Sequence, residues 1–230
     1  MRILVITGAG VSAESGIPTF RGKGGYWRNL DPAKLATPEA FARDPELVWQ
    51  WYCERRERIR AAKPNAAHEA ITRLSIVVPE FLLVTQNVDD LHARTGMATE
   101  KRAQIHGDVF VTRCSRCDEQ EKEREPENGV PTCSKCGALM RPGVVWFGEQ
   151  LDSARIDIVE RFLNRGPCDL VIVAGTTATF GYIIDWALRA SADGGELIEV
   201  NPEETALSRC ATKIVREPAA IALPRLINSL

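Results

Sequence analysis

The sequence predicts an α/β fold, with a parallel sheet that carries helices on both faces and a small second domain built around paired cysteines. Three observations support this class. Short apolar segments of strand length recur along the chain and alternate with helical segments, which is the order of a parallel sheet. The first of these segments runs straight into a glycine-rich turn. Two C-x-x-C pairs interrupt the alternation in the middle of the chain.

The first predicted strand is followed by a loop suited to an anion. Residues 3–6 read Ile-Leu-Val-Ile, an apolar run typical of a strand buried on both faces. Residues 8–13 match the dinucleotide pattern G-x-G-x-x-G/A, in which glycine lets the backbone approach a phosphate closely. We expect the N–H groups of Val11 and Ser12 to open a helix that faces the phosphate. An ordinary surface loop is the alternative.

The segment after this loop departs from the dehydrogenase version of the pattern. Gly16-Ile17-Pro18 ends the first helix after little more than one turn, whereas a dehydrogenase continues with a long helix and a strand that ends near an acidic residue. Residues 19–27 then combine glycines with aromatic and cationic side chains. We expect a mobile flap over the ligand here.

The composition limits what the chain can do. Its 230 residues suit one sizeable domain with an insertion. The 29 basic and 31 acidic residues give a net charge of −2, so no basic field indicates specific nucleic-acid binding. No apolar run is long enough to span a membrane and no signal peptide precedes the first strand, so we expect a cytoplasmic protein. Seven cysteines, an odd number, favour metal binding plus reduced thiols over a disulfide framework.

Residues 38–62 are predicted to be helical, and Pro45 begins a second helical segment within them. Tyr52 and Arg55 lie three residues apart, so they project from one face and can meet a common ligand. From the residues alone, a half-buried tyrosine beside a solvated arginine is the simpler interpretation.

Polar residues follow most of the later strands. Buried strands are expected at residues 81–85, 169–174 and 196–200, a short strand at 213–216, and helices at 65–74, 152–164, 180–192 and from 218 onward. Ligands of open α/β sheets bind outside the carboxyl ends of strands, so Gly8, Asn87, Gly175 and Asn201 should converge on one crevice. Asn87 or Asp89 can also cap the short helix that follows them, and the two roles are compatible.

The three histidines give little information by themselves. His106 stands between an apolar residue and a glycine. Histidine is the acid or base of neutral pH but also a common structural residue, and the residues alone favour the structural role. His68 lies in a predicted helix and His92 follows two aspartates, and neither receives a chemical role.

The two cysteine pairs predict a metal site. Cys114-x-x-Cys117 and Cys133-x-x-Cys136 have the spacing of a four-thiolate zinc ribbon. Four protein ligands leave no position for water or substrate, so we predict one structural Zn²⁺ that contributes directly to folding. The charged segment 119–129 between the pairs cannot build a core, which explains the need for metal. Nucleic-acid binding is a known use of zinc ribbons, and the acidic composition of this one disfavours it.

Residues 141–149, RPGVVWFGE, are extended and partly apolar. They can form an edge that pairs with the backbone of a peptide, or they can be a plain connection back to the main domain.

A series of motifs together resembles the sirtuin family and covers nearly the whole chain. The motifs are GAGVSAESGIPTFRG from Gly8, QNVD at 86–89, IHG around His106, the four paired cysteines, VVWFGE at 144–149, GTT at 175–177 and VNPE at 200–203. Sirtuins are NAD-dependent protein-lysine deacylases with a Rossmann-type domain and a small zinc domain, and the acyl-lysine threads the cleft between the two. The resemblance therefore implies NAD as a consumed co-substrate.

The resemblance also implies a set of NAD contacts. They are Gly8, Ala9, Gly10, Ser12, Ala13 and Glu14 around the pyrophosphate, Phe20 and Arg21 in the flap over the nicotinamide ribose, Gln86, Asn87 and Asp89 at the ribose and the nicotinamide amide, and Gly175, Thr176, Thr177, Asn201, Pro202, Glu203 and Ala219 on the adenosine side. His106 would be the general base, with Asn87 as a second catalytic residue.

In the family mechanism the acyl oxygen attacks the ribose carbon as nicotinamide leaves. The histidine then helps to deprotonate a ribose hydroxyl that attacks the resulting imidate, and the products are free lysine, nicotinamide and 2′-O-acyl-ADP-ribose. Breaking the glycosidic bond develops cationic character on the ribose, so fixed polar groups and exclusion of water are physically required.

The substrate is implied by a second, narrower resemblance. Tyr52 and Arg55 form a Y-x-x-R pair similar to that of the sirtuin branch that removes succinyl and malonyl groups, where the pair binds the distal carboxylate. Ala36 would leave room in the acyl pocket. Removal of acetyl groups is expected as well. The other residues implied on the substrate side are Val145, Phe147 and Gly148.

The implied domains are a Rossmann-type domain of residues 1–30, 63–110 and 143–230, and a small domain with a helical part at 31–62 and a zinc-ribbon part at 111–142. The implied partners are acylated-lysine proteins bound as extended peptides. Two other functions remain open from the residues. A nicotinamide-dependent dehydrogenase is disfavoured by the truncated first helix and the absent acidic residue, and a non-catalytic zinc-ribbon binding module is the third possibility.

Overall fold

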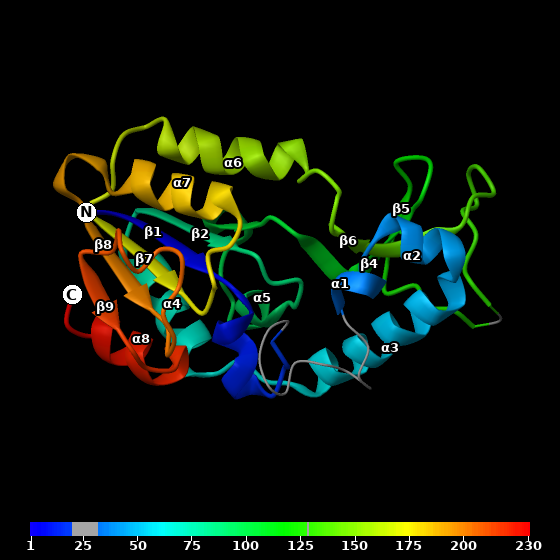
Figure 1. Ribbon diagram of the computed structural model, residues 1–230, viewed down its shortest axis with the longest axis horizontal. Helices are drawn as coiled ribbons and strands as arrows, with labels where there is room; N and C mark the ends of the chain where they lie inside the picture. Colours follow the sequence, from blue (N-terminus) through cyan, green and yellow to red (C-terminus); the bar gives the residue numbers. More distant parts are fainter. Residues whose placement is uncertain (20–31, 128) are drawn as a thin grey trace.

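The computed structural model describes residues 1–19, 32–127 and 129–230 (Figure 1). Phe20 and Arg21, and with them most of the predicted flap, lie outside the described residues. Within the described part of the chain, no helix is both long enough and apolar enough to cross a membrane.

Six parallel strands form the large sheet, in the order β3-β2-β1-β7-β8-β9. Their bounds are β1 Arg2–Thr7, β2 Glu80–Thr85, β3 Arg102–Gln104, β7 Leu170–Ala174, β8 Glu196–Val200 and β9 Lys213–Val215. The chain first adds β2 and β3 on one side of β1 and then crosses over to add β7, β8 and β9 on the other side. The strand order therefore reverses between β1 and β7, and such a reversal is where open α/β sheets bind ligands.

Helices cover both faces of this sheet, as predicted (Figure 1). One layer holds α4 (Ala66–Val77) and α8 (Ala219–Ile227), and the other holds α6 (Ser153–Leu163) and α7 (Gly181–Ala190). Alternate residues of β1 enter separate cores: Ile3 and Val5 pack on the α4 and α8 side, and Leu4 and Ile6 on the α6 and α7 side, all fully buried. This two-sided burial explains the continuous apolar run of the first strand.

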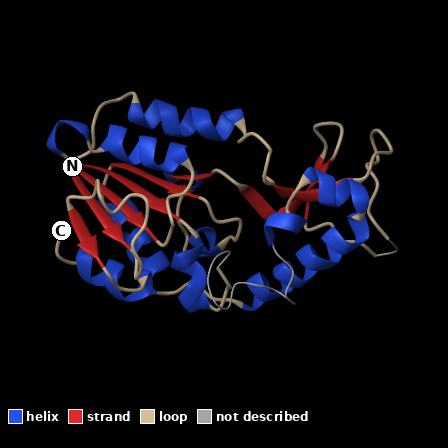
Figure 2. Cartoon of the chain, viewed as in Figure 1, coloured by secondary structure: helices blue, strands red, loops and turns tan. Residues whose placement is uncertain are grey.

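The small domain combines three helices with a second sheet (Figure 2). Its elements are α1 Pro32–Leu35, α2 Pro38–Arg43 and α3 Pro45–Ala61, and the antiparallel strands β4 Gly107–Cys114, β5 Gln120–Lys122 and β6 Met140–Val144 in the order β5-β4-β6. Thr37 and Asp44 cap α2 and α3 by accepting backbone N–H bonds, and a proline follows each cap. The fully buried Arg56 joins α3 to the sheet, because its guanidinium donates to the carbonyl oxygens of Val109 and Val111.

Most predicted elements are confirmed, and the differences are local. The four strands predicted after β1 match β2, β7, β8 and β9 to within one residue at each end. The first helix is short, as predicted, but it is a 3₁₀-helix, η1 (Ala9–Ser15), which ends at Gly16 with φ of +83°. The remaining short elements are α5 (Leu91–Arg94), η2 (Thr99–Lys101) and η3 (Ala192–Gly194). The strands β3 to β6 were not predicted as such, and β4 and β6 run across the predicted domain boundaries at 110 and 143.

Candidate functional site

The loops after β1 and β7 pack against each other through glycines. The Gly8 N–H donates to the Ala174 carbonyl at 3.0 Å and the Gly10 N–H donates to the Gly175 carbonyl at 2.8 Å. Gly175 has φ of +61°, and a β-carbon there would lie 2.4 Å from the Val11 nitrogen. Both conformation and space therefore exclude a side chain, and the two loops form one backbone surface at the reversal of strand order.

One detail of the predicted anion loop is different in the structure. The N–H of Val11, predicted to face a phosphate, donates to the Gly8 carbonyl at 3.0 Å. The reason is that η1 winds as a 3₁₀-helix, whose bonds join residues three apart and engage the N–H one residue earlier than an α-helix does.

Side chains from three strand ends meet at Thr176. The Gln86 amide, after β2, donates to the Thr176 hydroxyl at 3.0 Å. The Asn201 amide, after β8, donates to the Thr176 carbonyl at 2.9 Å. The predicted convergence of strand ends on one region is therefore confirmed. The other residues predicted to contact NAD lie at the same edge of the sheet, with Ala9 half-buried and Ala13 and Glu14 exposed on η1, Thr177, Pro202 and Glu203 exposed, and Ala219 buried at the start of α8.

A buried polar cluster supports the anion loop. The Ser12 hydroxyl donates to Asp89 at 3.0 Å and accepts from the Asn87 amide at 3.1 Å. The other Asp89 oxygen accepts the N–H of Leu91 at 3.1 Å, but the N-cap residue of α5 is Asp90, so Asp89 fixes the turn just before the helix and does not cap it as predicted. Burial raises the pKa of Asp89, and the two bonds it accepts oppose that rise. Ser12 is fully buried, so its side chain acts on the loop through Asn87 and Asp89.

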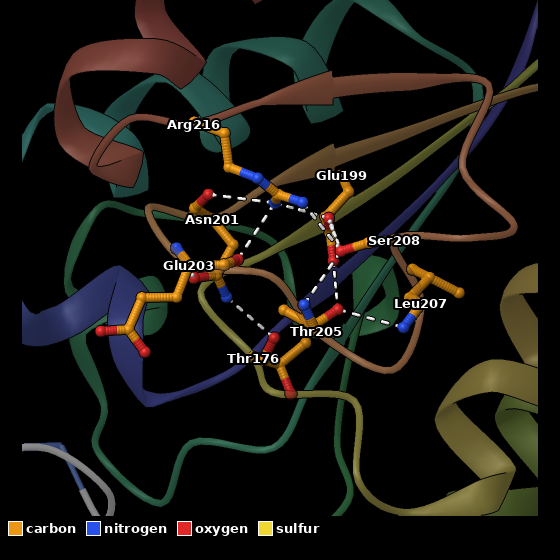
Figure 3. A network of polar contacts seen from close by, with 8 residues as sticks. All are labelled: Thr176, Glu199, Asn201, Glu203, Thr205, Leu207, Ser208 and Arg216. Carbon is orange, nitrogen blue, oxygen red and sulfur yellow. Dashed lines mark hydrogen bonds and ion pairs between the residues drawn. The ribbon is translucent and has the colours of Figure 1, made fainter.

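A second polar network fixes the loop after β8 (Figure 3). The carboxylate of Glu199, which is 1% exposed, accepts from the Ser208 hydroxyl at 2.6 Å and from Arg216 at 2.7 Å. Arg216 also donates to the backbone carbonyls of Asn201 at 3.3 Å and Glu203 at 3.0 Å. Sequence reasoning missed this pair, although a glutamate between the apolar Ile198 and Val200 of a predicted strand was a usable signal.

His106 is held by both ring nitrogens. Nδ1 lies 2.9 Å from the Gln86 carbonyl, which can only accept, so Nδ1 carries the hydrogen. Nε2 therefore has the lone pair, and it lies 2.7 Å from the Tyr182 hydroxyl. Burial lowers the pKa of His106 below its ordinary value, while the Gln86 bond opposes that change. The site thus contains a neutral imidazole beside the carboxyl ends of the strands, and Tyr182 was not identified from the sequence.

Tyr52 and Arg55 lie together on α3. Tyr52 is buried, and its hydroxyl accepts from Trp146 Nε1 at 2.9 Å, which leaves its own O–H free to donate. Burial raises the pKa of Tyr52 to about 12, so the phenol stays protonated. The Arg55 guanidinium carbon lies 5.7 Å from the centre of the Tyr52 ring and 4.9 Å from that of Trp51. Tyr52 is thus more buried than the sequence alone suggested, and the pair presents two donors from one face of the helix.

Trp146 connects Tyr52 to an ion pair. The Arg141 guanidinium lies over the Trp146 ring, 3.3 Å from its centre, and donates to Glu149. Glu149 also accepts the backbone N–H of Trp146 at 2.8 Å. Burial of Glu149 would raise its pKa, but the bonds from Arg141 and Trp146 overcome this and the pKa is lowered. The VVWFGE segment is therefore a fixed support behind the Tyr52 hydroxyl.

The predicted substrate-side residues are brought together around the end of β6. The Val145 N–H donates to the His106 carbonyl and the Phe147 N–H donates to the Ala36 carbonyl, both at 2.9 Å. Phe147 is 38% exposed, and the neighbouring Gly148 is exposed with φ of +86°. Because β6 is an edge strand of its sheet, it has a side without a strand partner among the described residues, as a peptide-pairing edge requires.

The four paired cysteines form one cluster. Cys114 and Cys136 have sulfur atoms 3.4 Å apart, Cys117 and Cys133 have sulfur atoms 3.7 Å apart, and all four sulfurs lie within 4.8 Å of one another. Tetrahedral zinc with bonds of about 2.3 Å places its sulfur ligands roughly 3.8 Å apart. The donor set and its spacing therefore fit one zinc ion.

Comparison with known proteins agrees with this geometry. Residues 8–180 match the model of the Sir2 family. A curated NAD-dependent protein deacylase 1 of Archaeoglobus fulgidus is 45% identical over 228 residues, which cover 98% of this chain and 91% of that protein. An NAD-dependent protein deacylase of Leptospira interrogans is 41% identical over 233 residues, covering 100% of this chain and 93% of that protein.

Solved structures show the same relationship. A crystal structure of a Sir2 homologue–NAD complex is 44% identical, with a TM-score of 0.91 over 99% of this chain and 88% of that one. A complex of Sir2 with a p53 peptide and NAD⁺ is 30% identical, with a TM-score of 0.85 over 99% of this chain and 92% of that one. The match over most of the sequence and the shared fold show that this chain belongs to the Sir2 family, the sirtuins.

Proposed function

We propose that this chain is an NAD-dependent protein-lysine deacylase that removes succinyl, malonyl and acetyl groups. The observation that carries the activity is His106, a neutral imidazole with its lone pair on Nε2, held between the strand ends and the β6 edge. A group in this state can take a proton from a ribose hydroxyl. The names of the curated relatives and the NAD and peptide complexes of the structural neighbours support the same activity.

NAD supplies the electrophilic ribose carbon when it is bound. In this proposal the backbone surface of Gly8, Gly10 and Gly175 lies against the pyrophosphate, and these glycines are needed because a side chain at any of them would collide with the facing loop. Gln86 and Asn87 orient the ribose and the nicotinamide amide, and the loop fixed by Arg216 holds the adenosine side. Two features disfavour hydride transfer. The first helix, η1, is short, and the described chain lacks the dehydrogenase order of a long first helix followed by a strand that ends near an acidic residue.

The zinc ion is structural in this proposal. Four thiolates complete its shell, so it has no position for water or substrate. Only Cys114, Cys133 and Met140 form the small buried cluster of this part of the described chain, too little apolar surface to hold it folded.

The acyl group is selected by Tyr52 and Arg55. Arginine's planar fork suits a carboxylate, and the Tyr52 O–H, left free by the bond from Trp146, adds a third donor. Both groups come from one face of α3, on the same small domain that provides Ala36 and β6. A succinyl or malonyl group has the distal carboxylate that this pair can bind, and an acetyl group lacks it.

We expect Arg55→Met to lower kcat/KM for a succinyl-lysine peptide by about 30-fold or more, because a charge-assisted bidentate contact is lost. Turnover of the matched acetyl peptide should change less than about threefold. The measurement is nicotinamide release with both peptides at equal concentration. Arg58→Met, exposed on the same helix, is the control and should change neither rate. An equal loss on both peptides in Arg55→Met would rule out the carboxylate role.

A further inference from the structure

The hydroxyl of Tyr182 occupies the one nitrogen of His106 that can accept a proton. Nδ1–H is committed to the Gln86 carbonyl at 2.9 Å, and Nε2 lies 2.7 Å from Tyr182 Oη. An sp² nitrogen has a single lone pair, so it accepts one strong hydrogen bond at a time. A substrate hydroxyl and Tyr182 therefore compete for the same atom.

Aromatic packing holds the Tyr182 hydroxyl in this position. Its ring stacks on Phe180, with centres 5.4 Å apart and planes 8° apart, and it also contacts Trp186 at 5.2 Å. The His106 ring meets Phe180 edge-on at 5.7 Å. Phe180 and the first turn of α7 thus present the hydroxyl to the imidazole as a fixed group.

The direction of the hydrogen bond is set by the protonation of both partners. Burial raises the pKa of Tyr182 to about 12, so at neutral pH it is a phenol and donates its O–H to Nε2. The pKa of His106 is shaped by burial and by the Gln86 carbonyl, and no charged side chain of the described residues contributes to it. Tyr182 is therefore the titratable group that faces this ring within the described part of the chain.

We propose that Tyr182 is a positioning residue for the general base: its hydroxyl holds the His106 ring with Nε2 facing the Tyr182 oxygen until the ribose hydroxyl replaces it. The catalytic role of His106 in this statement rests on the proposed function. With the neutral ring the Tyr182 O–H donates to Nε2, and with the protonated ring Nε2–H donates to the Tyr182 oxygen in a charge-assisted bond that is stronger. Removal of the hydroxyl must therefore make His106 harder to protonate.

The test is Tyr182→Phe, which keeps the stacked ring and removes the hydroxyl. The chain contains three histidines, so their ring signals can be followed individually by NMR titration. We expect the pKa of His106 to fall by roughly half to one unit, the difference between a charge-assisted and a neutral hydrogen bond. His68, with a pKa lowered by burial to about 4, and His92, with its pKa also lowered by burial, are internal references that should not move.

The change in the pKa of His106 also sets the direction in which the acid limb of kcat/KM moves. The base must be neutral, so kcat/KM falls as pH drops through the pKa of His106, and a lower pKa moves this acid limb to lower pH. In Tyr182→Phe the limb should move down by roughly the same half to one unit, while kcat/KM above the limb should fall by about three- to tenfold, because a weaker base in a less firmly held ring takes the proton. Trp186→Phe, which alters the packing but keeps the Tyr182 hydroxyl, should leave the limb in place.

An unchanged pKa of His106 in folded Tyr182→Phe would overturn the proposal. The titration does not depend on turnover. If the deacylase assignment failed, the pKa of His106 would still shift as expected in Tyr182→Phe, but no acyl transfer would be seen. If Tyr182→Phe does not fold, 3-fluorotyrosine at position 182 provides a stronger donor and should lower the pKa of His106. No change with that residue would equally contradict the positioning role.

Discussion

Replacing His106 with asparagine is expected to lower kcat for deacylation of every acyl peptide by about 10²- to 10⁴-fold, the usual contribution of a general base. Asparagine can still donate to the Gln86 carbonyl, which His106 Nδ1 contacts at 2.9 Å, so the local fold should survive. It provides no basic nitrogen in place of Nε2. The rates are measured by counting deacylated peptide, and calorimetric NAD binding is the control that should be nearly unchanged. A variant with more than about a tenth of the parent kcat would exclude His106 as the base.

The parent enzyme should show the corresponding pH dependence as part of the same experiment. Burial lowers the pKa of His106 below the ordinary value of 6.5, so the ring is neutral at pH 7 and is ready to accept a proton. Activity controlled by this group is fully present above its pKa and is lost as pH falls through it. The acid limb of kcat/KM therefore lies below pH 6.5.

Cys133→Ser is expected to remove the bound zinc and to destabilise the chain by about 4 kcal/mol or more, because structural zinc supplies folding free energy directly. Cys133 is buried in the four-sulfur cluster, where few apolar side chains can compensate for its loss. Zinc content per chain and denaturant unfolding provide the two measurements. Cys210→Ser is the matched control, since Cys210 is exposed and outside the cluster. Full zinc content and parental stability in Cys133→Ser would contradict the closed four-thiolate site.

The large sheet was predictable because its physical signals are local. The core strands β1, β2 and β7 are buried on both faces or nearly so, and a continuous apolar run records this in the sequence, whereas β8 is buried with Glu199 inside it. In the small domain β4 alternates buried and half-buried residues from Phe110 onward, and β5 has only three residues, none of them buried, so no such run marks them. Their pairing depends on distant partners and on the cysteine cluster.

The candidate site was predictable to the extent that motifs described it. The glycine contact between the loops after β1 and β7 explains Gly8, Gly10 and Gly175, and each had been singled out. Tyr182 had no motif, because its hydroxyl reaches His106 only through the packing of α7 against distant segments. Val11 was misjudged, since the choice between a 3₁₀-helix and an α-helix is set by a few backbone bonds that composition does not record.

One measurement tests the central claim most directly. Matched acetyl, malonyl and succinyl peptides are incubated with the protein, with and without NAD, and both nicotinamide and deacylated peptide are counted. We predict that both products form in a ratio of one to one and only in the presence of NAD. The parent protein should also turn over the succinyl and malonyl peptides faster than Arg55→Met does. Reduction of NAD without release of nicotinamide, or nicotinamide release without deacylated peptide, would contradict the account.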